Sequence, residues 1–257
     1  MGILILVILS ILVLVVAALT FWESYFVSTD TCTQCRGIPF CIIHIASRRD
    51  RESNVRRSLG LAARAGFTPM DKGAVVGNAP MEVTPFLDMT NRPNEMRSTL
   101  RPGEVGCFHS HHAAWYLGRD KGVVVCEDDA ILDNDCLTRM SEAIDYVSNV
   151  LRVEEFVIHG RYSPPRSFTG SCSNRVLTPT LCKVRCPCYN ANLYFASAGA
   201  CNMFCQVGSD PTNWMPVDDF ISSLSGCHPT RVVNESISAF AITPQGLHVM
   251  KSRSDTQ

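Results

Sequence analysis

Hydrophobic side chains dominate the start of the chain, where residues 2–22 contain no charged residue. As a helix, a run of this length extends about 30 Å, the thickness of the hydrocarbon core of a bilayer. Cleaved signal peptides have a shorter apolar region behind a basic start, and here no Lys or Arg precedes the run. The pattern therefore favours an uncleaved transmembrane signal anchor over residues 1–22. A cleaved signal peptide is the alternative.

Beyond the anchor, two kinds of apolar pattern alternate. Short continuous apolar runs predict strands buried on both faces, at residues 39–45, 122–126, 156–159 and 192–196. Apolar residues that recur every three or four positions predict helices at residues 47–66, 101–118, 136–151, 198–206 and 217–224. Residues 68–97 carry four prolines and little periodicity, so loops with one short strand are expected there. The alternation predicts an α/β fold, with a mainly parallel sheet flanked by helices on both faces.

The remaining segments complete the predicted organisation. Residues 23–38 are polar and predict a stem between the membrane and a single domain at residues 39–257. Residues 161–190 are rich in Pro, Ser and Cys and predict a loop insertion within that domain. The first basic residue after the anchor is Arg36, and acidic residues precede it, which favours a cytoplasmic N-terminus and a type II membrane protein.

Charge and cysteine content narrow the class of protein. A formal net charge of -1 excludes a nucleic-acid binder that works by bulk positive charge. Thirteen cysteines, all beyond the anchor, are typical of an oxidising compartment, so we expect disulfide bonds and a lumenal or otherwise extracytoplasmic domain. The glycosylation triplet at Asn234 fits that location. Cys41 and Cys126 lie in apolar runs, and we expect them to pack as small hydrophobic residues.

Three consecutive carboxylates, Glu127, Asp128 and Asp129, follow the predicted strand at 122–126. Ligands of parallel α/β sheets gather at the carboxyl ends of strands, where this triplet lies. Adjacent like charges repel unless a cation or strong donors offset them, and Mg²⁺ or Mn²⁺ prefers carboxylate oxygens. The triplet therefore predicts a divalent metal site. A solvated acidic turn before the next helix is the alternative.

Two sequence blocks carry a family resemblance. Residues 101–115 contain Gly-Cys, two residues, Ser-His, three residues and Trp, and residues 123–132 form an apolar strand that ends in Glu-Asp-Asp. Together they resemble the core of glycosyltransferase family 25, which includes lipopolysaccharide and procollagen galactosyltransferases. Shorter similarities lie at residues 42–45, 157–160, 192–200, 215–219 and 241–244. His44 stands where the family usually has Asn, and residues 172–188 match nothing in it.

The resemblance implies a GT-A fold and an inverting transfer from a nucleotide sugar, commonly UDP-galactose, to a glycan or glycoprotein hydroxyl. It also implies Mn²⁺ or Mg²⁺, with Asp129 as a ligand helped by Asp128 or Glu127. An inverting enzyme needs a base for the acceptor hydroxyl, and Asp218 is the candidate, with Asp219 as the neighbour that could exchange roles. Capping of the helix at 217–224 is the alternative for both.

Four further residues are candidates for the donor site. Ser110 and His111 precede the acidic strand end by one helix and are expected near the ribose or phosphates, although His111 could equally be a buried core histidine. Arg48 and Arg51 follow the first strand and are expected to meet the phosphates; exposed helix charges are the alternative.

Other classes of function remain open at this point. Cys32 and Cys35 have the spacing of a redox motif, and Cys182, Cys186 and Cys188 could supply zinc thiolates. We expect disulfides within a loop to be the commoner use of the second group. A membrane-tethered glycan-binding relative that has lost transfer is the remaining alternative.

Overall fold

The computed structural model of the chain describes residues 35–89, 95–161, 174–185, 188, 191–228, 237–242 and 250–251. The predicted anchor at 1–22, most of the stem, Asn234, Cys32, Cys172 and Cys186 lie outside these ranges. No helix in the described ranges combines the length and the apolar character that crossing a bilayer requires.

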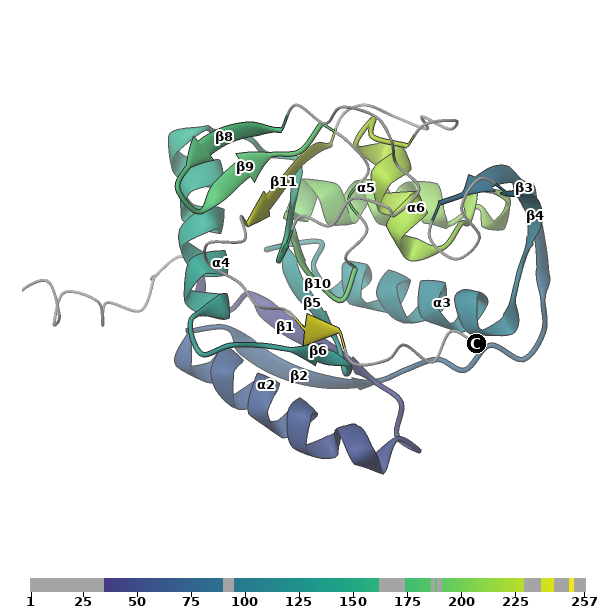
Figure 1. The fold of residues 1–257 in the computed structure, drawn as a ribbon, viewed down its shortest axis with the longest axis horizontal. Helices are drawn as coiled ribbons and strands as arrows, with labels where there is room; N and C mark the ends of the chain where they lie inside the picture. Colours follow the sequence, from purple (N-terminus) through teal and green to yellow (C-terminus); the bar gives the residue numbers. More distant parts are fainter. Residues whose placement is uncertain are drawn as a thin grey trace, which may run out of the picture.

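Eight of the described strands form one mixed sheet at the centre of the molecule (Figure 1). Their order is β2 (Thr68–Gly73), β1 (Pro39–His44), β5 (Val123–Glu127), β10 (Leu193–Ala196), β7 (Phe156–His159), β11 (Ser238–Ile242), β9 (Leu181–Lys183) and β8 (Arg175–Thr178). Strands β2, β1 and β5 pair in parallel, as do β7 and β11. Strand β10 lies antiparallel between β5 and β7, and β9 lies antiparallel between β11 and β8. Six of the eight strands therefore run in one direction, which confirms the mainly parallel sheet.

Helices cover both faces of this sheet, as the sequence pattern predicts. One face packs against α2 (Glu52–Arg64) and α4 (Cys136–Asp145), and the other against α3 (Pro102–Leu117), α5 (Ala198–Gly208) and α6 (Val217–Leu224). Alternate residues of β1 face the two helical layers, because neighbouring side chains of a strand point to opposite faces. Phe40 and Ile42 lie in the first core, and Cys41 and Ile43 in the second. The continuous apolar runs are thus strands buried on both sides.

Three short helical segments join these helices within the described residues. A 3-10 turn at Arg49–Arg51 precedes α2, a π-helical turn at Tyr146–Val150 extends α4, and a second 3-10 turn, Pro211–Asn213, lies between α5 and α6.

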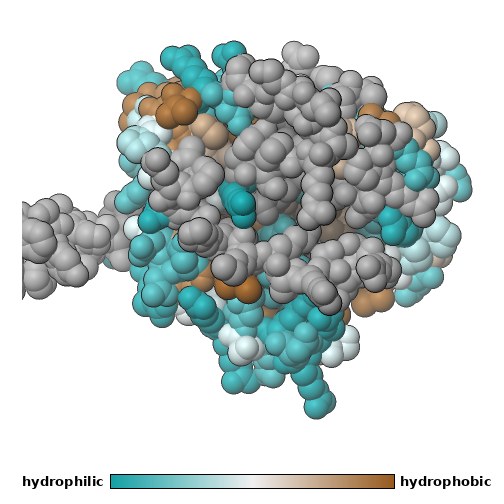
Figure 2. Space-filling view, in the orientation of Figure 1, coloured by the Kyte–Doolittle hydropathy of each residue, from teal (hydrophilic) through white to brown (hydrophobic). Residues whose placement is uncertain are grey.

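The outer side of α2 is polar, and this part of the surface is largely hydrophilic in Figure 2. Helix α2 is therefore amphipathic, with its apolar side on the sheet.

The expectation of loops over residues 68–97 was wrong. This segment contains β2 and most of a hairpin of β3 (Met81–Asp88) and β4 (Glu95–Leu100), which arches beside α3 (Figure 1). The pairing of β3 with β4 shifts register between Glu82 and Phe86, around Pro85. Such an irregularity breaks the alternation of polar and apolar residues, so the period of two that identifies a strand is lost.

The Cys-rich insertion also differs from the loop that its composition predicts. Strands β8 and β9 fall within residues 161–190 and extend the sheet at one edge. A further short pair joins β6 (Ala130–Ile131) to β12 (Met250–Lys251). The thiol of Cys182 is buried and donates to the carbonyl of Ala241, so it does not form the expected loop disulfide. The free thiols of the described residues include Cys41, Cys107, Cys126, Cys136, Cys182, Cys201, Cys205 and Cys227.

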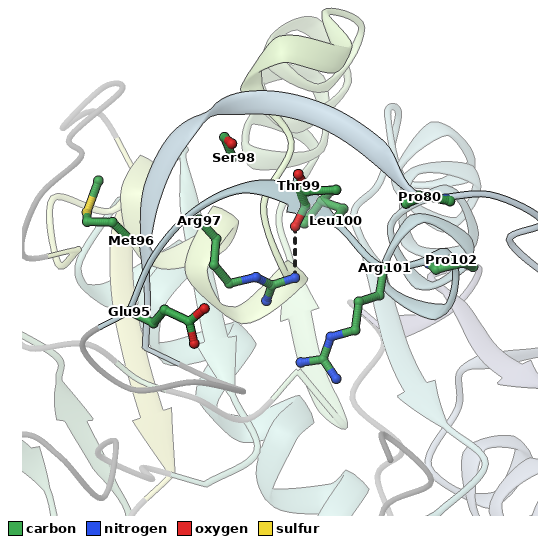
Figure 3. Close-up of a pocket in the computed structure, with 9 residues that line it drawn as sticks. All are labelled: Pro80, Glu95, Met96, Arg97, Ser98, Thr99, Leu100, Arg101 and Pro102. Atoms are coloured by element: carbon green, nitrogen blue, oxygen red, sulfur yellow. Dashed lines mark hydrogen bonds between the residues drawn. The ribbon is translucent and has the colours of Figure 1, made fainter.

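A buried arginine fixes the hairpin to the start of α3. The guanidinium of Arg97 contacts the carboxylate of Asp88, donates to both carboxylate oxygens of Glu104 at 3.0 and 2.7 Å, and donates to the carbonyl of Thr99 at 2.9 Å. Figure 3 shows the last contact, on the wall of a cavity of about 340 Å³. The hydrogen bonds to Glu104 raise the pKa of Arg97, so its charge is permanent.

We expect Arg97→Ala to lower the free energy of unfolding by about 3–5 kcal/mol, because it leaves Asp88 and Glu104 buried without their cation. Urea denaturation measures the loss. Arg56→Ala is the control, since the Arg56–Glu52 pair is exposed, and it should change stability by less than about 1 kcal/mol. Equal effects of the two substitutions would contradict the assigned role of Arg97.

Candidate active site

The acidic triplet lies where β1 and β5 end side by side. The two strands run parallel and Ile43 pairs with Glu127, so their carboxyl ends share one edge of the sheet. Just past this edge, the amide of Asp128 donates to the carbonyl of Ile43 at 3.1 Å, and the amide of Ile45 donates to Oδ2 of Asp128 at 3.0 Å. The chain direction of the first strand pair therefore fixes the triplet in place.

Asn54 of α2 holds the backbone of this acidic segment. Its Nδ2 donates to the carbonyl oxygens of Asp128 and Ala130, both at 2.8 Å. Sequence reasoning missed this residue, because nothing in the spacing of a single Asn on a helix indicates what its amide contacts. Only the pairing of β1 with β5 brings the start of α2 beside the triplet.

Asp128 is a charge-compensated residue. It is 3% exposed, and its Oδ1 lies 2.5 Å from Nη1 of Arg51 while its Oδ2 accepts from Ile45. Arg51 was expected to meet phosphates, but the structure places its guanidinium on this carboxylate. The guanidinium of Arg51 already neutralises the carboxylate of Asp128, so this residue is less suited than its neighbours to bind a metal.

Glu127 and Asp129 converge on a single amide. Nδ2 of Asn192 donates to Oε2 of Glu127 at 2.9 Å and to Oδ1 of Asp129 at 2.8 Å. Asn192 stands beside Glu127 because β10 runs antiparallel to β5, and its carbonyl accepts from the Glu127 amide at 2.8 Å. The segment 192–200 carries part of the family resemblance, yet the role of Asn192 was not predicted.

His111 is a buried histidine with one end on the triplet. Its Nε2 lies 3.2 Å from Oε1 of Glu127, and its Nδ1 lies 2.9 Å from the hydroxyl of Tyr194, which accepts from Nε1 of Trp115 at 2.7 Å. A carboxylate only accepts hydrogen bonds, so we assign the proton to Nε2, and the Tyr194 hydroxyl then donates to Nδ1. Burial raises the pKa of Tyr194 well above its ordinary value, which keeps this donor protonated. The ring of His111 is 0% exposed, so it contacts Glu127 rather than solvent.

Ser110 is engaged elsewhere. Its hydroxyl accepts from the amide of Val75 at 2.8 Å and donates to the carbonyl of Gly106 at 2.8 Å. A β-carbon at Gly106 would lie 2.4 Å from the carbonyl oxygen of Val75, so the chain after β2 passes too close to α3 for a larger residue. Ser110 and Gly106 therefore hold the connection from β2 to β3, whereas donor contacts were expected of Ser110.

The two acids of α6 have different surroundings. Oδ1 of Asp218 accepts from the amide of Ala191 at 2.7 Å, one residue before Asn192, and the side chain is half-buried. Asp219 is 0% exposed, with Oδ1 3.5 Å from Nε2 of His228. The segment 191–192 thus brings Asp218 to the acids after β5, while Asp219 faces the protein interior.

Asp128 and Asp129 line a pocket of about 600 Å³, together with Arg48, Asp50, Arg51, Ser53, Asn54, Arg57 and Ile131. Arg48 donates to both oxygens of Asp50 at 2.9 and 2.8 Å, and this pairing lowers the pKa of Asp50 to about 2. The pocket wall therefore contains three guanidinium groups and several carboxylates, next to the edge of the sheet where β5 ends. Such a surface can bind phosphate oxygens beside a cation.

Two of the three acids have surroundings that suit a hard divalent cation. Glu127 and Asp129 present converging carboxylates, and Asp129 reaches the pocket, so these two fit Mn²⁺ or Mg²⁺. Asp128 fits less well because of Arg51.

Among solved structures, the chain is similar to one described as the crystal structure of apo-UDP-glucose pyrophosphorylase, with a TM-score of 0.42 and 7% identity over 87% of this chain and 78% of that chain. No curated protein matches. The family model described as glycosyltransferase family 25 (LPS biosynthesis protein) matches residues 42–175, about half of the sequence. The chain therefore belongs to glycosyltransferase family 25.

Proposed function

We propose that this protein is a metal-dependent, inverting glycosyltransferase that moves galactose from UDP-galactose to a hydroxyl of a glycan or glycoprotein. The observation that carries the proposal is the pocket at the carboxyl end of β5, where Asp128 and Asp129 share a wall with Arg48, Arg51 and Arg57. Family membership supports glycosyl transfer in general. The donor, the metal and the stereochemistry are our inference from the pocket and from the family resemblance.

The arginine side of the pocket suits a nucleoside diphosphate. Arg48 and Arg57 line the cavity from the segment that follows β1, and guanidinium groups bind phosphate oxygens through paired hydrogen bonds. Arg51 contributes indirectly, since it neutralises Asp128 and so keeps the acidic segment next to the pocket. We assign the fold to the GT-A class on the basis of its mixed sheet and this edge site.

Glu127 and Asp129 would hold Mn²⁺ or Mg²⁺. Such an ion supplies positive charge that stabilises the departing diphosphate. Asn192 aligns the two carboxylates by donating to both, and His111 fixes the other oxygen of Glu127. These contacts orient the acids before the donor binds.

Asp218 is our candidate for the base that takes the proton from the acceptor hydroxyl. Its side chain is half-buried, whereas Asp219 is enclosed, and a general base must reach the hydroxyl that it deprotonates. The hydrogen bond from Ala191 positions the carboxylate of Asp218 beside Asn192.

The cellular setting is part of the proposal. The apolar run at residues 2–22 and the cysteine content support a type II membrane protein, with a stem at 23–38 and the catalytic domain at 39–257 in the lumen of the endoplasmic reticulum or Golgi.

A donor screen tests the proposal. The full-length chain is incubated with UDP-galactose, UDP-glucose, UDP-N-acetylglucosamine and GDP-mannose, with galactosides and collagen peptides as acceptors, and nucleotide release is measured. We expect release from UDP-galactose that EDTA abolishes and added Mn²⁺ restores, and a product of inverted anomeric configuration by NMR. Nucleotide release that persists in EDTA would contradict the requirement for a metal ion. The absence of release from every donor would contradict the transfer activity.

A further inference from the structure

Three side chains of different chemistry meet beside the acidic triplet. Cys107 and His111 lie one turn apart on α3, and Glu127 ends β5. One ligand atom from each lies within 4.8 Å of the others. The pocket lining described above includes none of the three, and the proposed transfer gives a role to Glu127 and, through its contact with Glu127, to His111, but none to Cys107.

The separations are close to those of a zinc centre. Oε1 of Glu127 lies 3.2 Å from Nε2 of His111 and 4.0 Å from Sγ of Cys107. Tetrahedral zinc, with bonds of about 2.0–2.3 Å, separates its ligand atoms by roughly 3.3–3.6 Å. Small side-chain movements would therefore bring all three atoms to bonding distance of one ion.

The histidine is already oriented for such a role. The Tyr194 hydroxyl contacts Nδ1 at 2.9 Å, which directs Nε2 towards Glu127, and Trp115 fixes the tyrosine from behind at 2.7 Å. Metal-bound histidines usually have a hydrogen-bond partner on the second ring nitrogen. Binding requires the tautomer in which Nδ1 donates to the Tyr194 oxygen, and an oxygen with two lone pairs can accept from both His111 and Trp115.

The chemistry of the three ligand atoms determines which ion the site prefers. Sulfur and imidazole nitrogen favour Zn²⁺ and Co²⁺, whereas Mn²⁺ and Mg²⁺ prefer oxygen alone. Glu127 brings one negative charge to the cluster and a bound Cys107 thiolate brings a second, which suits a divalent cation. Three protein ligands leave one position of a tetrahedral ion for water.

We propose that Cys107, His111 and Glu127 form a binding site for a thiophilic divalent ion, with zinc as the preferred ion. An ion bound there competes with the catalytic ion for Glu127. The thiol and Nε2 each release a proton to solvent when the ion binds, and Nδ1 takes one up. Binding itself is independent of the proposed function, whereas inhibition by zinc rests on it. Zinc would then switch the enzyme off by withdrawing Glu127 from the Mn²⁺ site.

Cobalt titration of the full-length chain under reducing conditions tests the site. Co²⁺ replaces Zn²⁺ in such centres, and a bound thiolate gives a charge-transfer band in the near ultraviolet. We expect one equivalent of Co²⁺ to produce this band and Zn²⁺ to displace it. Cys107→Ser should lose the band and weaken Zn²⁺ binding by roughly 100-fold, because one of three ligands is removed.

Cys205→Ser is the matched control, since Cys205 is another partly buried helix thiol, on α5 and outside the cluster. It should keep the band. Tyr194→Phe removes only the hydroxyl behind His111 and should weaken Zn²⁺ binding about 10-fold while the band remains. Circular dichroism and the thermal midpoint show whether each variant is folded.

The outcomes separate this site from the transfer activity. A band that survives Cys107→Ser, or no band with a folded wild-type chain, would overturn the site whatever the activity. A cobalt band that behaves as expected, in a chain without nucleotide-sugar turnover, would contradict the proposed function and leave the zinc site intact. With both present, Zn²⁺ should inhibit Mn²⁺-dependent turnover, and Cys107→Ser should need at least about 10-fold more Zn²⁺ for the same fractional inhibition.

Discussion

Asp129→Asn should lower the turnover number for the nucleotide sugar by roughly 10²–10³-fold. The substitution removes a negative charge at the point where a divalent cation would offset the charge of the leaving diphosphate, and groups of this kind contribute about that factor. The fold should survive, because the amide oxygen of Asn can still accept from Nδ2 of Asn192. Steady-state kinetics at saturating Mn²⁺ and the thermal midpoint measure the two effects.

Asp120→Asn is the matched control for this experiment. Asp120 is exposed and lies just before β5, at the end opposite to the triplet. It should leave turnover within about twofold of wild type, since exposed sites away from special contacts tolerate change. Turnover of Asp129→Asn equal to that of Asp120→Asn would remove Asp129 from the metal site.

Asp218→Asn should lower kcat by about 10²–10⁴-fold, with little change in KM for the donor. The amide oxygen of Asn can keep the hydrogen bond from Ala191, but it cannot take a proton from the acceptor. Measuring kcat and KM separately for donor and acceptor distinguishes a base from a binding residue.

Asp210→Asn provides the comparison within the same region. Asp210 is exposed and caps the 3-10 turn before α6 by accepting from the amide of Thr212 at 2.9 Å. This variant should retain kcat. A higher donor KM with unchanged kcat in Asp218→Asn would assign Asp218 to donor binding instead of proton transfer.

The elements of the core were predictable because their signals are local. The apolar run at 122–126 and the helical spacing of 217–224 both correspond to elements of the structure, and the bounds of α6 agree with the sequence pattern. The hairpin of β3 and β4 was not predictable, because its register shift removes the alternation on which a strand prediction depends. The sequence pattern thus identifies regular elements and misses irregular ones.

The site was predictable only in part. The strand that ends in Glu127, Asp128 and Asp129 identifies the edge of the sheet, since a run of acids after a buried strand is unusual in itself. The partners of these acids were not predictable: Asn54 and Asn192 lie 74 and 63 positions away from the residues that they hold. The position of Arg51 after the first strand gave the expectation of a phosphate contact, and its contact with Asp128 was likewise not predictable.

The antiparallel strand β10 has a consequence for biosynthesis. It lies between β5 and β7, sets Asn192 beside Glu127 and Asp129, and sets Tyr194 beside His111. A nascent chain that has reached residue 190 therefore holds β5 and β7 without the strand that joins them, and its acidic segment lacks the contacts of Asn192. Residues 191–242 complete both the sheet and these contacts, so a nascent chain without them lacks the arrangement on which the proposed transfer depends.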